Sequence, residues 1–360
     1  MLYYYSLLLV CAGATFLSSK VDKTIGRILT VVFVALPMCA LNALRDYDVG
    51  ADTRMYTMNW ALPQIEDSSF SQIWHEGRWE IGFAALCKLC LRTANPARCL
   101  LVVTSIVIFT LLTIAAFNIS ASPALVFFLY TLSGEFYVSM NAMRQAIAMS
   151  VVALALVFFY RNKNYVFIFL IICAAMFHKS ALVLLLLLVI RWLLGLKSKQ
   201  IIFAAVIALC IILLVIPAGI IAAVVAILGY DNYLDSVVDG SGHATPIIYL
   251  ICFLCWGICW LIADRRDNSQ AAICCKSVLV FSILLCVCSV KNAIIFRLID
   301  YGMISMVLFG GYFRSSHITR NSDVVENALF YGPFIILFCY TTYLIPTWTN
   351  VFPYVLGTDF

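Results

Sequence analysis

Residues 99–118 read CLLVVTSIVIFTLLTIAAFN and contain no charged side chain. An α-helix needs about 20 mainly apolar residues to cross the hydrocarbon core of a bilayer. Apolar runs of about this length recur along the chain, separated by short groups of Lys, Arg, Asp, Asn or Pro. Of the 360 residues, 64% are hydrophobic and 11% charged, against roughly 45–50% and 25% in a soluble domain. The sequence therefore excludes a soluble globule.

The pattern predicts an all-α, polytopic integral membrane protein with one domain over residues 1–360 and about twelve transmembrane helices. The longest polar segment is too short to bury a core of its own, so any chemistry must lie in loops and at helix ends. The expected helices are residues 1–18, 28–44, 99–118, 124–140, 141–160, 165–177, 178–194, 201–229, 244–263, 271–290, 292–313 and 328–346.

The basic residues between helices predict the orientation of the chain. Five basic turns satisfy the positive-inside rule when they face the cytoplasm: Lys20 to Arg27, Arg161 with Lys163, Lys197 with Lys199, Arg265 with Arg266, and Arg314 with Arg320. Residues 45 and 98 then both lie outside, so residues 45–98 form an outer loop. Within it, Glu80, Lys88 and Arg92 share about a third of a helical wheel, which predicts an amphipathic helix on the outer surface. The alternative is a spanning helix there, with the irregularity displaced to residues 120–145.

Two other features have simple explanations. The apolar run 1–18 lacks a basic leader and a cleavage site, so we expect a retained first helix that starts outside. The 15 cysteines lie mostly inside apolar runs, and the pair Cys87 and Cys90 has no His or carboxylate next to it. They are interpreted as small apolar fillers, and neither a metal nor another cofactor is predicted.

Basic residues on the outer side are the exceptions to the orientation rule. Such groups suggest an anionic ligand at that face. Six of them fall in one segment: Arg45, Arg54, Arg78, Lys88, Arg92 and Arg98.

The outer segment begins with RDYDVGADTRMY over residues 45–56. Asp48 and Asp52 place carboxylates at the membrane surface beside Arg45 and Arg54, where they could orient a sugar or provide a general base. A solvated turn with local Arg–Asp pairs is the alternative.

Arg144 opens a helix at the outer boundary, where its guanidinium suits bidentate binding of phosphate. An ion pair with Glu135 or simple snorkelling is the alternative. His178 and Lys179 break a long apolar run between two short helices, and His is suited to proton transfer near neutral pH. A structural role for this His is the competing interpretation.

Arg297 and Asp300 lie three apart inside a late apolar helix, roughly two turns from its outer end. They are interpreted either as a mutual pair or as the wall of a wet cavity with Arg297 facing a phosphate. The acidic outer loop 230–243 is interpreted as a solvated loop, with a lid or a sugar-binding loop as the alternatives. Neither a nucleotide-binding loop nor a nucleic-acid patch is found.

Taken in order, these motifs resemble the EpsG family of the bacterial Wzy-type polysaccharide polymerases. Ala51 replaces the glycine more usual in that family, and the motifs span most of the chain. The resemblance is carried by Arg45 with VGADT over residues 49–53 and Tyr56, EIGF over 80–83, MRQAIA over 143–148, FHKSA over 177–181, Arg297, and FPY over 352–354.

The resemblance implies a glycosyltransferase that polymerises O-antigen or capsule repeat units carried on undecaprenyl pyrophosphate, at the periplasmic face of the inner membrane. Arg144 and Arg297 would bind the diphosphate with support from Arg45, and Asp52 or His178 would be the base. Further binding candidates are Arg54, Tyr56, Glu80 and Asp300. The implied partners are the lipid-linked oligosaccharide, membrane lipids, a chain-length regulator and a flippase, and no nucleic acid.

Other functions remain open at this stage. An O-antigen ligase uses the same donor, and a lipid-linked sugar flippase is a transporter that needs no base. A membrane acyltransferase lacks its usual His–Asp signature here. The surface helix after the first outer loop also resembles those of GT-C glycosyltransferases, by analogy only.

Overall fold

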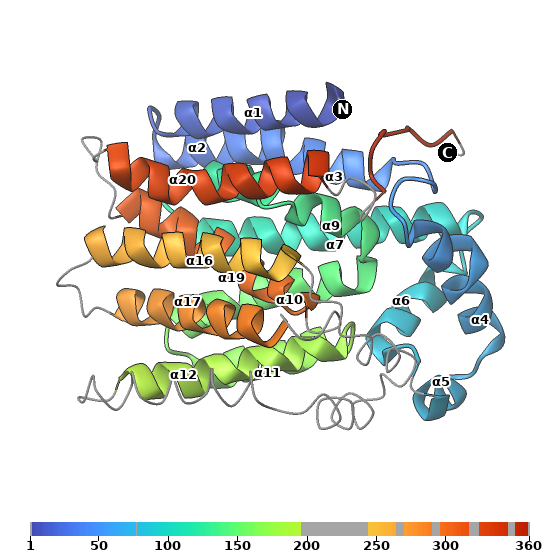
Figure 1. Ribbon diagram of the computed structural model, residues 1–360. Helices are drawn as coiled ribbons and strands as arrows, with labels where there is room; N and C mark the ends of the chain where they lie inside the picture. Colours follow the sequence, from blue (N-terminus) through green and yellow to red (C-terminus); the bar gives the residue numbers. More distant parts are fainter. Residues whose placement is uncertain are drawn as a thin grey trace. The chain divides into compact units, whose positions relative to one another are not determined.

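The computed structural model describes residues 2–76, 78–195, 244–263, 270–289, 296–316, 324–344 and 350–358. Over this part the chain is helical, with one isolated bridge between Arg45 and Leu356, so the all-α prediction is confirmed (Figure 1). The chain divides into two compact units. Unit 1 comprises Met1–Leu182, Val307–Thr319 and Ile335–Phe360, and unit 2 comprises Val183–Met306 and Arg320–Phe334. The expectation of one domain over residues 1–360 stays a prediction.

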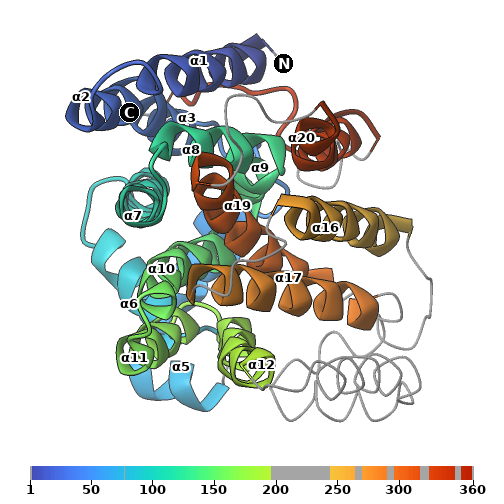
Figure 2. The same ribbon diagram turned by 90° about the vertical axis from the view of Figure 1, so that its left-hand side faces the viewer.

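Unit 1 is a bundle of apolar helices in which α10 lies between α7 and α11 (Figure 2). Helix α1 packs against α2 and α8, and α3 packs against α7. The helices that begin in this unit are α1 (Leu2–Ser18), α2 (Lys23–Thr30), α3 (Leu36–Ala43), α4 (Ala61–Asp67), α5 (Phe70–Glu76), α6 (Ile81–Cys90), α7 (Pro96–Ile119), α8 (Pro123–Leu132), α9 (Glu135–Asn141), α10 (Met143–Tyr160) and α11 (Asn164–Ala175), with the wide turns η1 (Val31–Ala35) and η2 (Met55–Asn59) and the 3-10 helix η3 (Lys179–Leu185).

Helices α2 and α3 form one continuous apolar stretch through η1. Pro37 follows this wide turn and has no N–H for the usual helical hydrogen bond, so the chain widens locally instead of breaking. Ile28, Phe33 and Leu36 are exposed along it. An exposed apolar face is expected on a helix that contacts lipid.

Five helical stretches among the described residues are long and apolar enough to cross a membrane: Lys23–Ala43, Pro96–Ile119, Met143–Tyr160, Ala272–Ser289 and Val324–Leu344. The protein is therefore a membrane protein. The expected ranges have helical counterparts apart from 201–229, which lies outside the described residues. A total of about twelve spanning helices stays a prediction.

Three short helices, α4, α5 and α6, gather at one end of unit 1, next to the end of α3 and the start of α7 (Figure 1). Helix α6 packs against α4, α5 and α7. Its ten residues rise about 15 Å, roughly half the thickness of a hydrocarbon core. Helix α6 is thus too short to cross a bilayer alone, which agrees with the expected surface helix; its side of the membrane stays a prediction.

Unit 2 contains α12 (Leu186–Leu194), α16 (Ala244–Ala263) and α17 (Gln270–Ser289), with the first parts of α19 (Ile299–Ser316) and α20 (Val324–Cys339), which η5 (Tyr340–Leu344) follows. Helix α17 packs against α12 and α16. The Trp256 indole donates to the Phe330 carbonyl at 2.9 Å and links α16 to α20. This bond satisfies a buried polar group inside an apolar unit.

Candidate functional site

Three charged or titratable side chains from three separate segments meet in unit 1. Glu80 precedes α6, Arg144 lies in the first turn of α10, and His178 follows α11. The Glu80 Oε2 atom accepts a hydrogen bond from Arg144 Nη1 at 2.6 Å. The other oxygen, Oε1, lies 3.3 Å from His178 Nδ1 and accepts from the Lys179 main-chain N–H at 3.3 Å. One carboxylate therefore joins two of the site candidates from the sequence, Arg144 and His178.

The local backbone explains why Glu80 is available for these contacts. It occupies the N-cap position of α6, where Ser, Thr, Asp or Asn usually caps the helix, and its side chain makes no capping bond. Two residues later, the Gly82 N–H donates to the Met176 carbonyl at 2.8 Å. A Cβ atom on Gly82 would lie 2.8 Å from that same oxygen. Only glycine lets α6 approach the end of α11 this closely, and this contact brings His178 to Glu80.

Aromatic rings surround the Arg144 guanidinium. Its Cζ atom lies 4.9 Å from the ring centre of Trp79, 5.8 Å from that of Tyr56 and 6.0 Å from that of Phe83. Trp79 is itself buried and donates to Gln64 Oε1 at 3.2 Å. Rings at these distances stabilise a cation that has lost much of its water.

Burial and charge act in opposite directions on Glu80, whose side chain is only 5% exposed. Burial by itself would raise the pKa of the carboxyl group, but the hydrogen bond with His178 and the charge of Arg144 outweigh it and lower the pKa from 4.5 to about 2. Glu80 is therefore ionised at neutral pH. An ionised carboxylate accepts only, so Nδ1 of His178 donates to it. When the ring is neutral, the nitrogen that can accept a proton is then Nε2.

Arg45 is fully buried, and its hydrogen bonds hold the start of the 45–98 segment in place. Its guanidinium donates to the Val49 carbonyl at 3.3 Å, to the Met140 carbonyl at 2.8 Å, and to both oxygens of Asn42. Burial lowers its pKa to about 9, so it stays charged at neutral pH. In this conformation its donors face protein oxygens; the expected support for a diphosphate stays a prediction.

The 44–50 loop is closed by the far end of the sequence. The Asp46 N–H donates to Val355 at 2.9 Å, the Gly357 N–H to Leu44 at 2.9 Å, and the Gly50 N–H to Asn350 at 2.9 Å. Gly50 has a φ of +98°, and a Cβ atom there would lie 2.6 Å from the Met140 carbonyl oxygen. The loop conformation thus requires glycine at position 50.

The remaining candidates from the outer loop have different surroundings. Tyr56 is buried and borders Arg144, as described above. Asp52 lies one helical turn before it, and its main-chain N–H donates to Asn141 Oδ1 at 2.8 Å. Arg54 is exposed and forms a two-pronged ion pair with Asp48. The solvated Arg–Asp pair considered from the sequence is therefore present, and a ligand role for Arg54 stays a prediction.

Arg297 and Asp300 belong to unit 2, apart from the unit that holds Glu80. The expectation that Arg297 lies inside a helix is corrected: it lies in a turn at residues 297–298, and α19 begins only at Ile299. Helical spacing therefore does not place Arg297 on one face with Asp300. Arg297 is exposed and Asp300 buried. The loop 230–243 lies outside the described residues.

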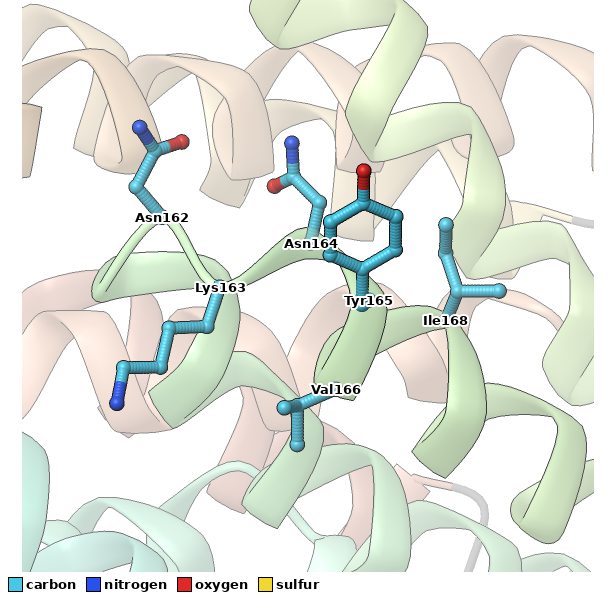
Figure 3. Close-up of a pocket in the computed structure, with 6 residues that line it drawn as sticks. All are labelled: Asn162, Lys163, Asn164, Tyr165, Val166 and Ile168. Carbon is cyan, nitrogen blue, oxygen red and sulfur yellow. The ribbon is translucent and has the colours of Figure 1, made fainter.

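A hollow of about 540 Å³ lies at the turn between α10 and α11. It is at the opposite end of α10 from Arg144, and one short segment, residues 162–168, supplies its lining (Figure 3). The side chains do not converge: Tyr165 and Lys163 point in opposite directions. Because a binding site needs converging polar groups, we place no function there. Within the described ranges, no group of three or more His, Cys, Asp or Glu could hold a metal ion.

The sequence pointed to Arg144 and His178 but did not join them through Glu80, and it missed Trp79. The available signal was the run Arg78, Trp79, Glu80 directly before an apolar helix, which puts a cation, an indole and a carboxylate at a helix start. Chemically, the cluster can hold an anion with Arg144 and accept a proton at His178.

These observations define an all-helical polytopic membrane protein with a buried charged cluster where its helices end. The chain belongs to the EpsG family, whose family model matches residues 28–356. Members of this family are polymerase-like glycosyltransferases of the Wzy type, so the resemblance predicted from the motifs is confirmed. No curated protein and no solved structure matches the chain.

Proposed function

We propose that the protein polymerises lipid-linked oligosaccharide repeat units for O-antigen or capsule, at the periplasmic face of the inner membrane. A sugar hydroxyl of the incoming unit attacks the anomeric carbon of the chain carried on undecaprenyl pyrophosphate. A new glycosidic C–O bond forms, the bond from that carbon to the diphosphate breaks, and undecaprenyl pyrophosphate leaves. The hydroxyl proton passes to a base on the protein.

One observation carries the proposal: Glu80 links a partly buried arginine to a histidine within a chain of this family. The leaving diphosphate gains negative charge as its bond to carbon breaks, and Arg144 supplies a cation in surroundings of low polarity, where it acts more strongly than in water. The Nη1 atom of Arg144 is engaged by Glu80, and Nε is buried without a partner among the described residues. The ion pair therefore does not use the whole guanidinium.

His178 is the base that the geometry favours. Because Nδ1 donates to Glu80, Nε2 is the nitrogen that would take the proton of the attacking hydroxyl. In many hydrolases a carboxylate likewise accepts a hydrogen bond from Nδ1 of a histidine and so orients this histidine as a base. Asp52 is the second candidate, since it lies one turn from Tyr56 at the edge of the same cluster. In this scheme Arg45 positions the outer loop, and the site is built from unit 1 alone.

The decisive experiment replaces the chromosomal copy by variants and separates the surface glycan by chain length on a gel. Deletion should remove long chains and leave a single capped unit, as expected for a polymerase. Arg144→Ala should do the same at normal protein level. The matched control is Arg161→Ala, at the other end of α10, where the Arg161 side chain donates to the exposed Asn118 side chain at 2.6 Å. This variant should leave the ladder intact.

Three results would contradict parts of the proposal. Loss of all surface glycan on deletion would indicate a flippase or a ligase instead. A normal ladder from Arg144→Ala would remove Arg144 from the site. Normal polymerisation by His178→Ala, with loss of it in Asp52→Asn, would assign the base to Asp52.

A further inference from the structure

Arg78 differs from three other arginines of the outer loop, Arg45, Arg54 and Arg98. Arg45 and Arg98 are buried and donate to main-chain carbonyls, and Arg54 is paired with Asp48. Arg78 is exposed, and among the described residues it makes neither a hydrogen bond nor an ion pair. Its guanidinium is nevertheless held in place, because its Cζ atom lies only 3.5 Å from the ring centre of Trp60.

The position of Arg78 connects it with the buried cluster. Its Cζ atom lies 5.9 Å from the ring centre of Trp79, and the Cζ atom of Arg144 lies 4.9 Å from that same ring centre. Trp60 and Trp79 also pack against each other, with ring centres 5.9 Å apart. Two guanidiniums, that of the exposed Arg78 and that of the partly buried Arg144, therefore border one indole.

The charges explain why a second cation is needed. Glu80 is ionised and pairs with Arg144 at 2.6 Å, so this pair has no net charge of its own. An anion that approaches the pair meets a carboxylate as well as a guanidinium. Arg78 lies near the Glu80–Arg144 pair and has no counterion among the described residues. A guanidinium that stacks on an aromatic ring keeps its N–H groups directed outward in its own plane, where they can bind an anion.

We propose that Arg78, held on Trp60, is the outer cation of the diphosphate site and captures the diphosphate of the lipid-linked substrate before it reaches Arg144. The inference rests on the proposed function and adds to it a binding residue and a positioning residue. Arg78 contacts the anion directly, and Trp60 acts by orienting Arg78.

The test measures polymerisation by purified protein in nanodiscs of neutral phosphatidylcholine, with the concentration of lipid-linked repeat unit varied. Loss of a charge-assisted contact should raise the half-saturating concentration about tenfold or more in Arg78→Ala, with a smaller change in the maximal rate. Inorganic pyrophosphate should inhibit this variant correspondingly more weakly. Trp60→Ala should show the same shift, and Arg78→Lys a smaller one, because an ammonium lacks the planar fork.

Arg92→Ala is the matched control. Arg92 is also an exposed arginine of the outer loop, but it follows the opposite end of α6 from Glu80. It should leave the half-saturating concentration unchanged. Equal values for the Arg78→Ala and Arg92→Ala proteins would overturn the inference.

Two further arms separate the sources of failure. If the shift in Arg78→Ala occurs only in nanodiscs that contain anionic phosphatidylglycerol, Arg78 binds lipid headgroups and the inference is overturned. If the unchanged protein makes no polymer from lipid-linked units, the proposed function itself fails. Binding of pyrophosphate to that protein, measured by calorimetry and weakened in Arg78→Ala, would still support the anion site.

Discussion

The Glu80–Arg144 ion pair gives the sharpest test of the site as described. Glu80→Gln keeps the shape of the side chain but leaves the partly buried Arg144 as an uncompensated charge. Removing one partner of a buried pair costs about 3–5 kcal/mol. The lowering of the Glu80 pKa from 4.5 to about 2, to which the His178 hydrogen bond contributes together with the Arg144 charge, corresponds to about 3 kcal/mol. The two estimates agree in order of magnitude, so we expect Glu80→Gln to lower the free energy of unfolding by about 3 kcal/mol.

A double-mutant cycle then isolates the pair. Glu80→Gln combined with Arg144→Met removes both charges, and the double variant should be no less stable than Glu80→Gln alone. The assay is equilibrium unfolding in mixed detergent micelles. Asp48→Asn is the comparison, because it breaks the exposed pair with Arg54 and should leave stability nearly unchanged. Additivity of the two single changes within about 0.5 kcal/mol would refute the buried ion pair.

Three other outcomes follow from the geometry. Gly50→Ala should destabilise the protein by more than 1 kcal/mol, because the φ of Gly50 is +98° and the new Cβ would meet a carbonyl oxygen. Gly13 lies within a helix with open space around it, so Gly13→Ala should stabilise the protein by about 0.5–1 kcal/mol. Thermal unfolding of the two variants tests both expectations. Gly82→Ala should separate α6 from Met176 and abolish polymerisation at normal protein level; an intact ladder on the glycan gel would contradict that contact. In acid titration, the stability due to Glu80 should be complete above about pH 4.5 and lost as the pH falls toward 2, because its pKa is lowered on folding; a Glu80→Gln protein with the same pH profile would refute this.

The sequence was sufficient for the fold class and for part of the site. The uncharged run at residues 99–118 predicts α7 because length and hydropathy alone decide whether a helix suits a membrane. Arg144 and His178 could be singled out because each interrupts an apolar stretch. Their common partner, Glu80, could not be assigned, since it lies 64 positions from one and 98 from the other.

Arg45 illustrates why the surroundings of a charge are harder to predict than its presence. As an arginine at the start of an outer loop, it suggested a ligand. In the structure it is fully buried, and one of its acceptors, the Met140 carbonyl, is 95 positions away. Every residue has a main-chain carbonyl, so the sequence does not indicate which carbonyl groups surround Arg45. The turn at Arg297 was missed for a related reason, because hydropathy is the same in a helix and in the turn that begins it.

The closure of the 44–50 loop by residues 350–357 has a consequence for the order of synthesis. The loop is made early, but the Asp48 carbonyl bonds with Asn350, 302 positions later, and the Tyr4 hydroxyl with Val351, 347 positions later. A nascent chain must therefore insert its first helices while these groups still lack their partners. Ribosome-bound chains that stop before residue 350 should expose the loop to protease, and longer ones should protect it.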